Sequence, residues 1–302
     1  MTTTISPYQL GATLYVPATR SDLADIVLRQ KIPDLRSLVI CLEDSIKAHE
    51  IPLALGNVQQ LLAALASDTI SERPLLFIRP RHIGMAHELL SLKGIKQING
   101  LVLPKFDNGS FQAWQQLIEH APQHWVFMPT LETAAILDVI AVRELCQALK
   151  ASFFKQRILV LRIGGNDLLS CLKLRHSHTH TLYDGPLNYV VGMLVAHFVP
   201  ADFYLTAPVF DCFRNVELLK AEFQRDLLNG LVGKTVIHPM QISIIHSALK
   251  VDRHDYEAAK RILDPKEPAV FEFEGAMCEP STHQRWAWQT LERAKYFGYL
   301  TA

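Results

Sequence analysis

Short apolar runs rich in β-branched residues alternate along this chain with longer segments whose apolar residues recur every three or four positions. The short runs resemble buried strands, whereas segments such as 51–66, 133–150 and 215–229 have the spacing of helices that pack on a sheet. Eight strands are predicted, at residues 12–17, 37–42, 74–78, 100–103, 124–128, 157–163, 203–206 and 234–237. The pattern therefore predicts a repeated strand–helix unit.

Polar or charged residues follow these predicted strands. They are Thr19, Asp44, Arg79, Lys105, Glu132, Asp167, Asp211 and His238. Eight strand–helix units form an α/β fold of the (β/α)8 TIM-barrel type, whose active site lies at the carboxyl ends of the strands. The alternative, an open doubly wound sheet that binds a nucleotide, has a glycine-rich first turn, and the turn at 16–20 has no glycine. We expect a TIM barrel with its site at the polar end.

The chain is long enough for a barrel and one further segment. A predicted helix at 240–249 completes the barrel domain, residues 1–249, and leaves a C-terminal helical extension, residues 250–302. Helical spacing recurs in the extension at 256–263 and 284–297. We expect the extension either to cap its own barrel or to pack on a neighbouring subunit.

Composition excludes several classes of partner. The chain has 302 residues, 49% of them hydrophobic, and its 30 basic residues balance its 30 acidic ones, so no basic surface favours nucleic acid. No apolar segment has the length of a membrane span, and the N-terminus lacks the pattern of a signal peptide. The five cysteines are scattered without Cys-x-x-Cys spacing, which favours free thiols in a reduced cytoplasm.

Glu132 and Asp167 end two consecutive predicted strands and form the main candidate site. Their strands would be neighbours in a barrel, so the two carboxylates would face the same region. Hard carboxylate oxygens suit Mg²⁺, which keeps open positions for water and for substrate oxygens. The alternative is that each acid caps the helix that follows its strand. Both interpretations are consistent with these positions.

Gly164, Gly165 and Arg79 are candidate contacts to a substrate. Two glycines at a strand end let a ligand approach the backbone and supply amide donors. Arg79 ends an apolar strand, where a guanidinium is costly unless it meets an anion such as a substrate carboxylate. The alternative is a structural ion pair of Arg79 with Glu43 or Asp44.

Four further residues at strand ends are candidates for proton transfer or charge compensation. Glu43 and Asp44 are adjacent, so only one can point over the barrel mouth, and the other is expected to cap a helix. Lys105 is expected to neutralise an oxyanion or an acid, because nearby carboxylates keep an ammonium protonated and disfavour imine chemistry. His238 either orients the substrate or is a structural histidine.

A segment rich in histidine follows the sixth predicted strand. It reads Arg175-His176-Ser177-His178-Thr179-His180. Imidazole suits zinc or nickel, but no companion Cys or Glu-x-x-His pattern completes a pocket. We expect a polar loop, placed near enough to the sixth strand to overhang the active face.

Seven short motifs, each at a strand end, resemble the citrate lyase β-subunit-like, or HpcH/HpaI aldolase, superfamily in their order. The motifs are Leu14-Tyr15-Val16-Pro17, Leu42-Glu43-Asp44-Ser45, Ile78-Arg79, Leu103-Pro104-Lys105, Leu131-Glu132-Thr133, Gly164-Gly165-Asn166-Asp167-Leu168 and Ile237-His238-Pro239-Met240-Gln241. The resemblance covers residues 10–245. It implies a TIM barrel, usually homo-oligomeric, with Mg²⁺ held by Glu132 and Asp167 and with Arg79 on the substrate.

Two departures separate this chain from most members of that superfamily. Gly11 stands where the family has an arginine that serves coenzyme A thioester binding in many members, and residues 207–211 lack the usual Asp-Gly pair. The opening at 11–20 resembles a divergent branch, the carbon–carbon bond lyases associated with tellurium-resistance-type gene clusters. A coenzyme A thioester such as citryl-CoA or malyl-CoA is therefore left open as a substrate.

The resemblance implies a Mg²⁺-dependent carbon–carbon bond lyase or aldolase that acts through a metal-stabilised enolate on a carboxylate-bearing 2-oxo acid or acyl substrate. Lys105 would balance the developing charge, and the base would be Glu43, Asp44, His238 or a metal-bound water. One alternative is a metal-dependent thioester hydrolase or related enolate chemistry. Another is a catalytically silent metabolite-binding partner in a biosynthetic or stress-response complex.

Overall fold

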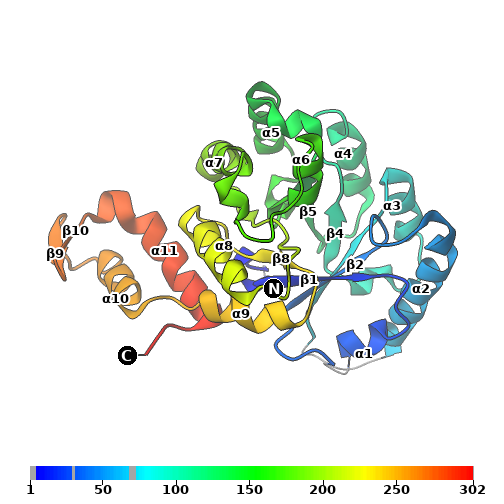
Figure 1. The fold of residues 1–302 in the computed structure, drawn as a ribbon, viewed down its shortest axis with the longest axis horizontal. Coiled ribbons are helices and arrows are strands. Elements are labelled where there is room, and N and C mark those ends of the chain that lie inside the picture. Colours follow the sequence, from blue (N-terminus) through cyan, green and yellow to red (C-terminus); the bar gives the residue numbers. More distant parts are fainter. Residues whose placement is uncertain (1–4, 29–30, 68–72, 302) are drawn as a thin grey trace. The chain divides into compact units, whose positions relative to one another are not determined.

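The computed structural model describes residues 5–28, 31–67 and 73–301. The main strands of this part of the chain are β1 (Ala12–Pro17), β2 (Ser37–Cys41), β3 (Leu75–Arg79), β4 (Gly100–Leu103), β5 (Val126–Leu131), β6 (Leu161–Ile163), β7 (Leu205–Thr206) and β8 (Lys234–Val236). They form one parallel sheet in the order β7-β6-β5-β4-β3-β2-β1-β8 (Figure 1). A parallel bridge between Ala207 and Lys234 joins its two ends. The predicted (β/α)8 barrel is confirmed.

The strand bounds differ from the prediction mainly at β5 and β6. β5 continues to Leu131 through Pro129, although proline has no N–H to donate to a neighbouring strand. β6 begins only at Leu161, and Ile158 before it makes an isolated parallel bridge to Phe127. The Arg157 guanidinium donates hydrogen bonds to the carbonyl oxygens of Trp125, Ile118 and Pro122.

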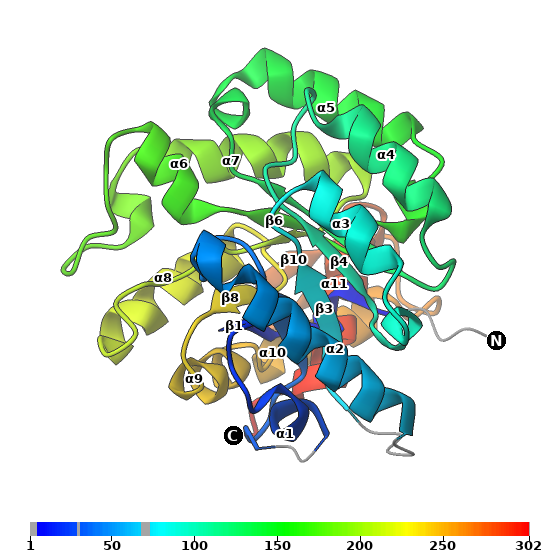
Figure 2. The same cartoon turned by 90° about the vertical axis from the view of Figure 1, so that its right-hand side faces the viewer.

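Helices follow the strands along the chain and surround them (Figures 1 and 2). They are α1 (Leu23–Leu28), α2 (Ile51–Ser67), α3 (Ile83–Leu90), α4 (Phe111–His120), α5 (Val139–Ala151), α6 (Gly165–Cys171), α7 (Leu187–Phe198), α8 (Val216–Leu228) and α9 (Met240–Ala248). The helix predicted at 133–150 is divided into the 3-10 turn η4 (Ala134–Leu137) and α5, because the Asp138 side chain accepts a hydrogen bond from the Ile140 N–H and caps α5.

Shorter 3-10 turns complete the connections. They are η1 (Pro7–Gln9), η2 (Ala48–Glu50), η3 (Ile95–Gln97), η5 (Lys155–Arg157), η6 (Leu182–Asp184) and η7 (Val199–Ala201). Among the described residues, no helix combines the length and the apolar character that a membrane crossing requires.

The register of the strands determines which side chains point into the barrel. Arg162 pairs in register with Thr130 on one side and with Thr206 on the other. Neighbouring residues of parallel strands point to the same face, and every second residue returns to that face. Glu132 and Gly164 lie two residues beyond Thr130 and Arg162, directly after β5 and β6, and therefore continue the same inward columns at the carboxyl ends. The register thus places charged groups at the mouth, above an inward layer that contains Arg162, Thr130 and Thr206.

The chain divides into two compact units, Met1–Ser243 and Ile244–Ala302. The second unit contains α10 (Arg253–Ile262), a hairpin of β9 (Phe271–Phe273) and β10 (Ala276–Cys278), and α11 (Pro280–Phe297). The hairpin was not predicted; its turn residues Glu274 and Gly275 both have positive φ, as tight hairpin turns require. Packing of this unit on a neighbouring subunit stays a prediction.

Candidate active site

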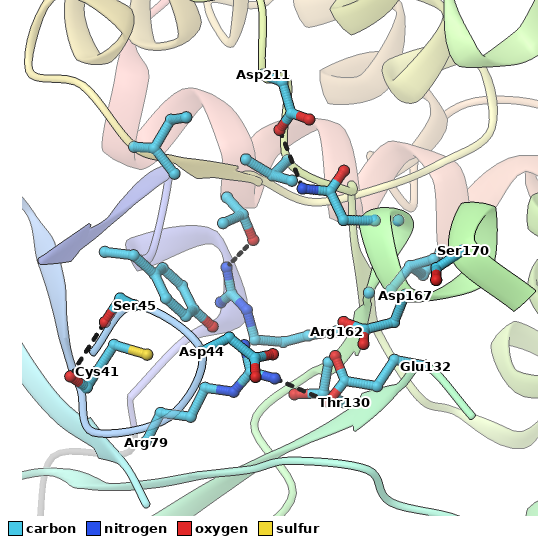
Figure 3. Close-up of a pocket in the computed structure, with 18 of the residues that line it drawn as sticks. Cys41, Asp44, Ser45, Arg79, Thr130, Glu132, Arg162, Asp167, Ser170 and Asp211 are labelled. Carbon is cyan, nitrogen blue, oxygen red and sulfur yellow. Dashed lines mark hydrogen bonds and ion pairs between the residues drawn. The ribbon is translucent and has the colours of Figure 1, made fainter. Parts of the chain in front are cut away.

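A cavity of about 540 Å³ lies at the carboxyl ends of the barrel strands (Figure 3). Five of the charged residues that follow predicted strands line it, and one of them is Asp211. Asp44 follows β2, Arg79 ends β3, Glu132 follows β5, and Asp167 lies in the first turn of α6; all four line the cavity. The structure therefore brings residues separated by more than a hundred positions to one site.

Glu132 is the most deeply buried carboxylate of this site, with 2% of its surface exposed. Its Oε1 accepts hydrogen bonds of 2.8 Å from the Arg79 Nη2 and from the backbone N–H of Lys105. Burial raises the pKa of Glu132, and the positive charges of Arg79 and Lys105 oppose that rise. In the described part of the chain, Oε2 has no hydrogen-bond partner, so one carboxylate oxygen is free to bind a ligand.

Lys105 places its ammonium among the carboxylates. Its Nζ donates to Asp167 and lies 3.7 Å from a carboxylate oxygen of Glu43, 3.7 Å from one of Asp44, and 3.9 Å from Glu132 Oε1. Burial lowers the pKa of Lys105, but the Glu132 charge and the contact with Asp167 outweigh burial and raise it. The ammonium therefore stays charged, which disfavours imine chemistry.

The backbone of Lys105 has a left-handed conformation, with φ of 50°. For a residue with a side chain this conformation costs about 1–2 kcal/mol. It directs the Lys105 N–H at Glu132 and the Lys105 side chain at Asp167. Backbone strain of this kind is often retained where it positions functional groups.

The donor set fits a divalent cation. Glu132 and Asp167 supply hard oxygens, and Mg²⁺ sites often use only one or two carboxylates with water in the other positions. The Lys105 ammonium shows that a positive charge is stabilised between them. Among the described residues, no cluster of three or more His, Cys, Asp or Glu side chains is arranged to hold a metal, so a bound ion would take its remaining ligands from water or substrate.

Arg79 lies where the sequence predicts, but carboxylates already surround it. Its Nη2 is 2.6 Å from Glu43 Oε2 and 2.8 Å from Glu132 Oε1. Burial lowers the pKa of Arg79, but the charges of Glu132 and Glu43 outweigh burial and raise it. Arg79 thus forms the ion pair with Glu43 that was the alternative to a substrate contact. Arg79 also contacts the carboxylate of Glu132.

The two adjacent acids after β2 have different surroundings. Glu43 is buried, with 4% of its surface exposed, and burial raises its pKa to about 7 although the Arg79 charge opposes the rise. Asp44 lines the cavity, and its side chain is 68% exposed. Asp44 is therefore the member of the pair that a substrate in the cavity can reach.

His238 and the proposed helix caps have other arrangements. The His238 Nδ1 accepts a hydrogen bond from the Met240 N–H, and its ring stacks on Phe213 at 4.8 Å. This geometry is that of a structural histidine at the start of α9. Thr133 and Gly164 occupy the cap positions before η4 and α6, so neither Glu132 nor Asp167 is a helix cap.

Gly164 and Gly165 create space for other side chains. A Cβ on Gly164 would lie 2.4 Å from the Cβ and 2.5 Å from the Oε2 of Glu132, and a Cβ on Gly165 would lie 2.7 Å from the Cβ of Pro208. Contacts this short cannot be accommodated without movement. Gly164 is therefore required by the position of Glu132, and Gly165 by the position of Pro208. The predicted role of the Gly-Gly step in substrate binding stays a prediction.

The Gly164→Ala variant is expected to displace the Glu132 carboxylate and to lose affinity for Mg²⁺, with a destabilisation of about 1–3 kcal/mol. Gly192→Ala, in α7, is the matched control because no atom lies within 4 Å of its added Cβ. Thermal unfolding and Mg²⁺ titration of both variants test this. Equal Mg²⁺ affinity in the two variants would contradict the steric role.

Arg162 was not predicted as a site residue, although it is the charged residue inside the apolar run 157–163. It is 1% exposed and lines the cavity together with Tyr15, Thr130 and Thr235. Its Nη2 donates to Thr235 Oγ1 at 2.7 Å, and its guanidinium lies 5.3 Å from the centre of the Tyr15 ring. A charged residue within an inward column of a strand was the signal that could have identified it.

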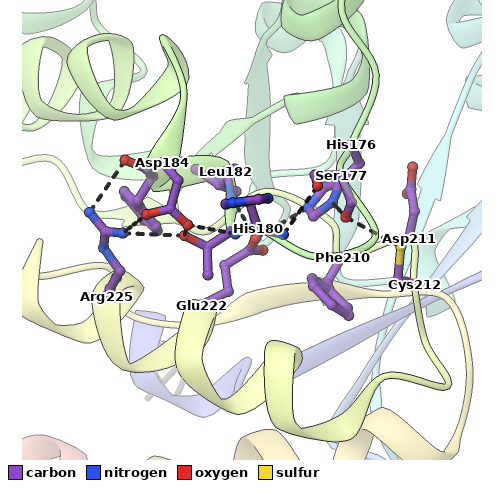
Figure 4. A network of polar contacts seen from close by, with 12 residues as sticks. His176, Ser177, His180, Leu182, Asp184, Phe210, Asp211, Cys212, Glu222 and Arg225 are labelled. Atoms are coloured by element: carbon purple, nitrogen blue, oxygen red, sulfur yellow. Dashed lines mark hydrogen bonds and ion pairs between the residues drawn. The ribbon is translucent and has the colours of Figure 1, made fainter.

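The histidine-rich segment is attached to α8 by buried polar contacts (Figure 4). The His176 Nε2 lies 3.2 Å from Glu222 Oε2, and that oxygen also accepts the Leu182 N–H at 2.9 Å. The His178 Nδ1 lies 3.2 Å from the Cys212 sulfur, and the His180 Nδ1 lies 2.9 Å from Thr179 Oγ1. The three rings thus have separate partners.

The His176–Glu222 pair predicts a pH-dependent contribution to stability. Burial lowers the pKa of His176, but the adjacent Glu222 carboxylate outweighs burial and raises it. The contribution is therefore complete below pH 6.5, the ordinary histidine pKa, and is lost as the pH rises through the raised value.

The difference in unfolding free energy between the wild type and His176→Gln is expected to be about 2 kcal/mol near pH 6 and smaller at pH 9. Urea unfolding at both pH values measures it. A difference that does not change with pH would contradict the charged pair.

A family model for carbon–carbon bond lyases of the TIM-barrel fold (C-C_Bond_Lyase) matches residues 4–299. This chain belongs to the carbon–carbon bond lyase family. The match confirms the predicted resemblance to carbon–carbon bond lyases with a TIM-barrel fold. A search of curated proteins finds no match to the chain.

Several solved structures have the same fold. Protein CitE from Mycobacterium tuberculosis, in complex with magnesium, acetoacetate and coenzyme A, has a TM-score of 0.69 at 20% identity and covers 95% of this chain and 99% of its own. RipC from Yersinia pestis has a TM-score of 0.59 at 21% identity, covering 80% and 96%. The citrate lyase β subunit from M. tuberculosis, with oxaloacetate and magnesium, has a TM-score of 0.58 at 20% identity, covering 81% and 99%.

Proposed function

We propose that this protein is a Mg²⁺-dependent carbon–carbon bond lyase or aldolase that acts on a carboxylate-bearing 2-oxo acid or acyl substrate. The arrangement of Glu132 and Asp167 around one cationic position at the mouth of the cavity carries the proposal. Family membership supports the class of reaction. The structural neighbours that contain magnesium with oxaloacetate or acetoacetate support the ion and the type of substrate.

The residues of the site have distinct roles in this proposal. Glu132 Oε2 and Asp167 would hold the ion, which supplies a Lewis acid that polarises a carbonyl and favours enolate formation. Lys105 would hold Asp167 in place and balance negative charge that develops on the substrate. Asp44 is the predicted base that lines the cavity, so we assign proton transfer to it.

Arg79 would act mainly on the metal ligand. Because its Nη2 contacts both Glu43 and Glu132, its charge would keep Glu132 ionised and fix the direction of its Oε2. This positioning role differs from the substrate contact expected from the sequence. Substrate carboxylate binding then requires another cation of the cavity.

Coenzyme A thioesters stay among the candidate substrates. Gly11, the departure that argued against them, precedes β1 at its amino end, whereas the cavity lies at the carboxyl ends. Its φ of 55° is left-handed, which explains why this chain has glycine there. The departure therefore leaves the lining of the cavity unchanged.

Product analysis tests the proposed reaction directly. The purified protein is incubated with Mg²⁺ and either oxaloacetate or malyl-CoA, and the products are identified by mass spectrometry. The expected result is cleavage of a carbon–carbon bond in at least one compound, which gives two smaller products. Free coenzyme A with an intact acid would indicate thioester hydrolysis, and an unchanged panel despite demonstrated binding of both compounds would indicate a metabolite-binding protein; either outcome would contradict the proposal.

A further inference from the structure

Arg162 carries a positive charge in the barrel interior that no acid of the described chain neutralises. Its neighbours are the hydroxyls of Thr13 and Thr235, the Met128 sulfur and the Tyr15 ring. Burial lowers the pKa of Arg162; Tyr15 opposes that fall, and the positive charge of Arg79 adds to it. A buried guanidinium without a counter-ion costs several kcal/mol, so its retention points to an anion from outside the chain.

The groups around Arg162 also have unused hydrogen-bonding capacity. The Arg162 Nε, the Thr130 Oγ1 and the Thr206 Oγ1 are buried and have no hydrogen-bond partner among the described residues. The three residues are in register on β5, β6 and β7. Buried polar groups are normally satisfied, so adjacent unsatisfied groups beside a cavity indicate a missing ligand.

The position of Arg162 relative to the proposed metal site restricts the ligand. Arg162, on β6, lies two residues before Gly164, and Thr130, on β5, lies two residues before Glu132. Two residues of a strand span about 6.6 Å, so Arg162 forms a floor below the ring of carboxylates. Figure 3 shows the Arg162 side chain beside Asp167, among the residues that line the cavity. This separation is comparable with the length of succinate or glutarate.

We propose that Arg162 binds the second carboxylate of a short dicarboxylic substrate at the floor of the cavity, while the other end of that substrate lies at Glu132 and Asp167. The inference rests on the proposed function and specifies its substrate class. A guanidinium binds a carboxylate through two parallel N–H donors. Arg79 is engaged by Glu43 and Glu132, so among the described residues that line the cavity Arg162 is the cation without a carboxylate partner.

Calorimetric titration with malonate, succinate and glutarate in the presence of EDTA tests the site without the metal. The Arg162→Met variant is expected to bind the best of these anions about 10- to 100-fold more weakly than the wild type. Arg143→Met, at an exposed position of α5, is the control and should bind like the wild type. Arg162→Lys retains the charge and should recover part of the affinity.

The melting temperature gives a second readout. Because Arg162→Met removes an uncompensated buried charge, its ligand-free melting temperature should be no lower than that of the wild type. Unchanged anion affinity in folded Arg162→Met, no binding by the wild type, or tighter binding of inorganic phosphate than of any dicarboxylate would overturn the inference.

Added Mg²⁺ separates this inference from the proposed function. Mg²⁺ should increase the affinity of the wild type for the dicarboxylate more than its affinity for butyrate, and Asp167→Asn should remove that increase. If wild-type protein binds the dicarboxylate in EDTA but Mg²⁺ does not increase its affinity, the metal site is contradicted. If wild-type protein binds the dicarboxylate only when Mg²⁺ is present, the role of Arg162 is contradicted.

Discussion

The Glu132→Gln variant is expected to fold, to lose high-affinity Mg²⁺ binding and to lose turnover by about 1,000-fold, the size of effect that one preorganised electrostatic contact has in an active site. The amide keeps the shape of the side chain, and its oxygen can still accept the hydrogen bonds from Arg79 and Lys105. The change therefore removes the charge with little change in packing. Burial already disfavours the ionised form of Glu132, so loss of the negative charge should not unfold the barrel.

Mg²⁺ titration, circular dichroism and the product assay measure these three properties together. Glu119→Gln, an exposed position of α4, controls for the general effect of losing one carboxylate. Mg²⁺ affinity equal to that of the wild type in Glu132→Gln would remove Glu132 from the metal site.

The Lys234→Met variant is expected to lose about 3–5 kcal/mol of stability, the cost of leaving buried charges without their partner. Lys234 is fully buried at the start of β8, and its Nζ lies 3.0 Å from Glu222 Oε1 and 2.7 Å from Asp226 Oδ2. Burial raises the pKa of Asp226 to about 6 although Lys234 opposes the rise. Without the ammonium, two carboxylates would face each other in the core.

The same carboxylates hold the segment after α6. Glu222 accepts the Leu182 N–H, and Asp226 accepts the Tyr183 hydroxyl at 2.5 Å. Loss of Lys234 should therefore loosen this segment as well as α8.

Urea unfolding compares Lys234→Met with Lys220→Met, whose ammonium is 53% exposed and pairs with Glu217 at 2.9 Å. The control should change stability by less than about 1 kcal/mol. A double variant that adds Asp226→Asn should recover part of the loss. Equal stability of the two single variants would contradict the ionic role of the buried cluster.

The barrel was predictable from the sequence because its strands are short, apolar and buried on both faces. β1 and β4 have the predicted bounds, since each is a β-branched or apolar run between turn-forming residues. The start of β6 was not predictable, because residues 158–160 are as apolar as the strand itself and only their pairing, an isolated bridge from Ile158 to Phe127, separates them from it. The β9–β10 hairpin was missed because its two strands have only three residues each, too few to show the alternation of apolar and polar residues that identifies a strand.

The location of the site was predictable, whereas the pairing of its charges was not. Position after a strand identified Asp44, Arg79, Glu132 and Asp167, because barrel topology brings the carboxyl ends together. Which carboxylates share Arg79 depends on the barrel's register and on the left-handed backbone of Lys105, and neither follows from local sequence.

Arg162 shows the limit of that reasoning. A charged residue inside a strand points either into the barrel or toward the helices, and only the register with Thr130 and Thr206 decides between them. Arg162 is a candidate for binding a substrate carboxylate because it has no acidic partner among the described residues. That absence is a property of the folded chain and not of the local sequence.

Proton–deuterium exchange at the α-carbon tests the central claim most directly, because it requires only enolate formation and not the complete cleavage reaction. Pyruvate, oxaloacetate, acetyl-CoA and malate are incubated in deuterium oxide with the wild type and with Asp167→Asn, with and without Mg²⁺, and exchange is followed by NMR. The predicted result is exchange in at least one compound that requires Mg²⁺ and disappears in Asp167→Asn. Exchange that is independent of Mg²⁺, or that persists in Asp167→Asn, would contradict a metal site at Glu132 and Asp167.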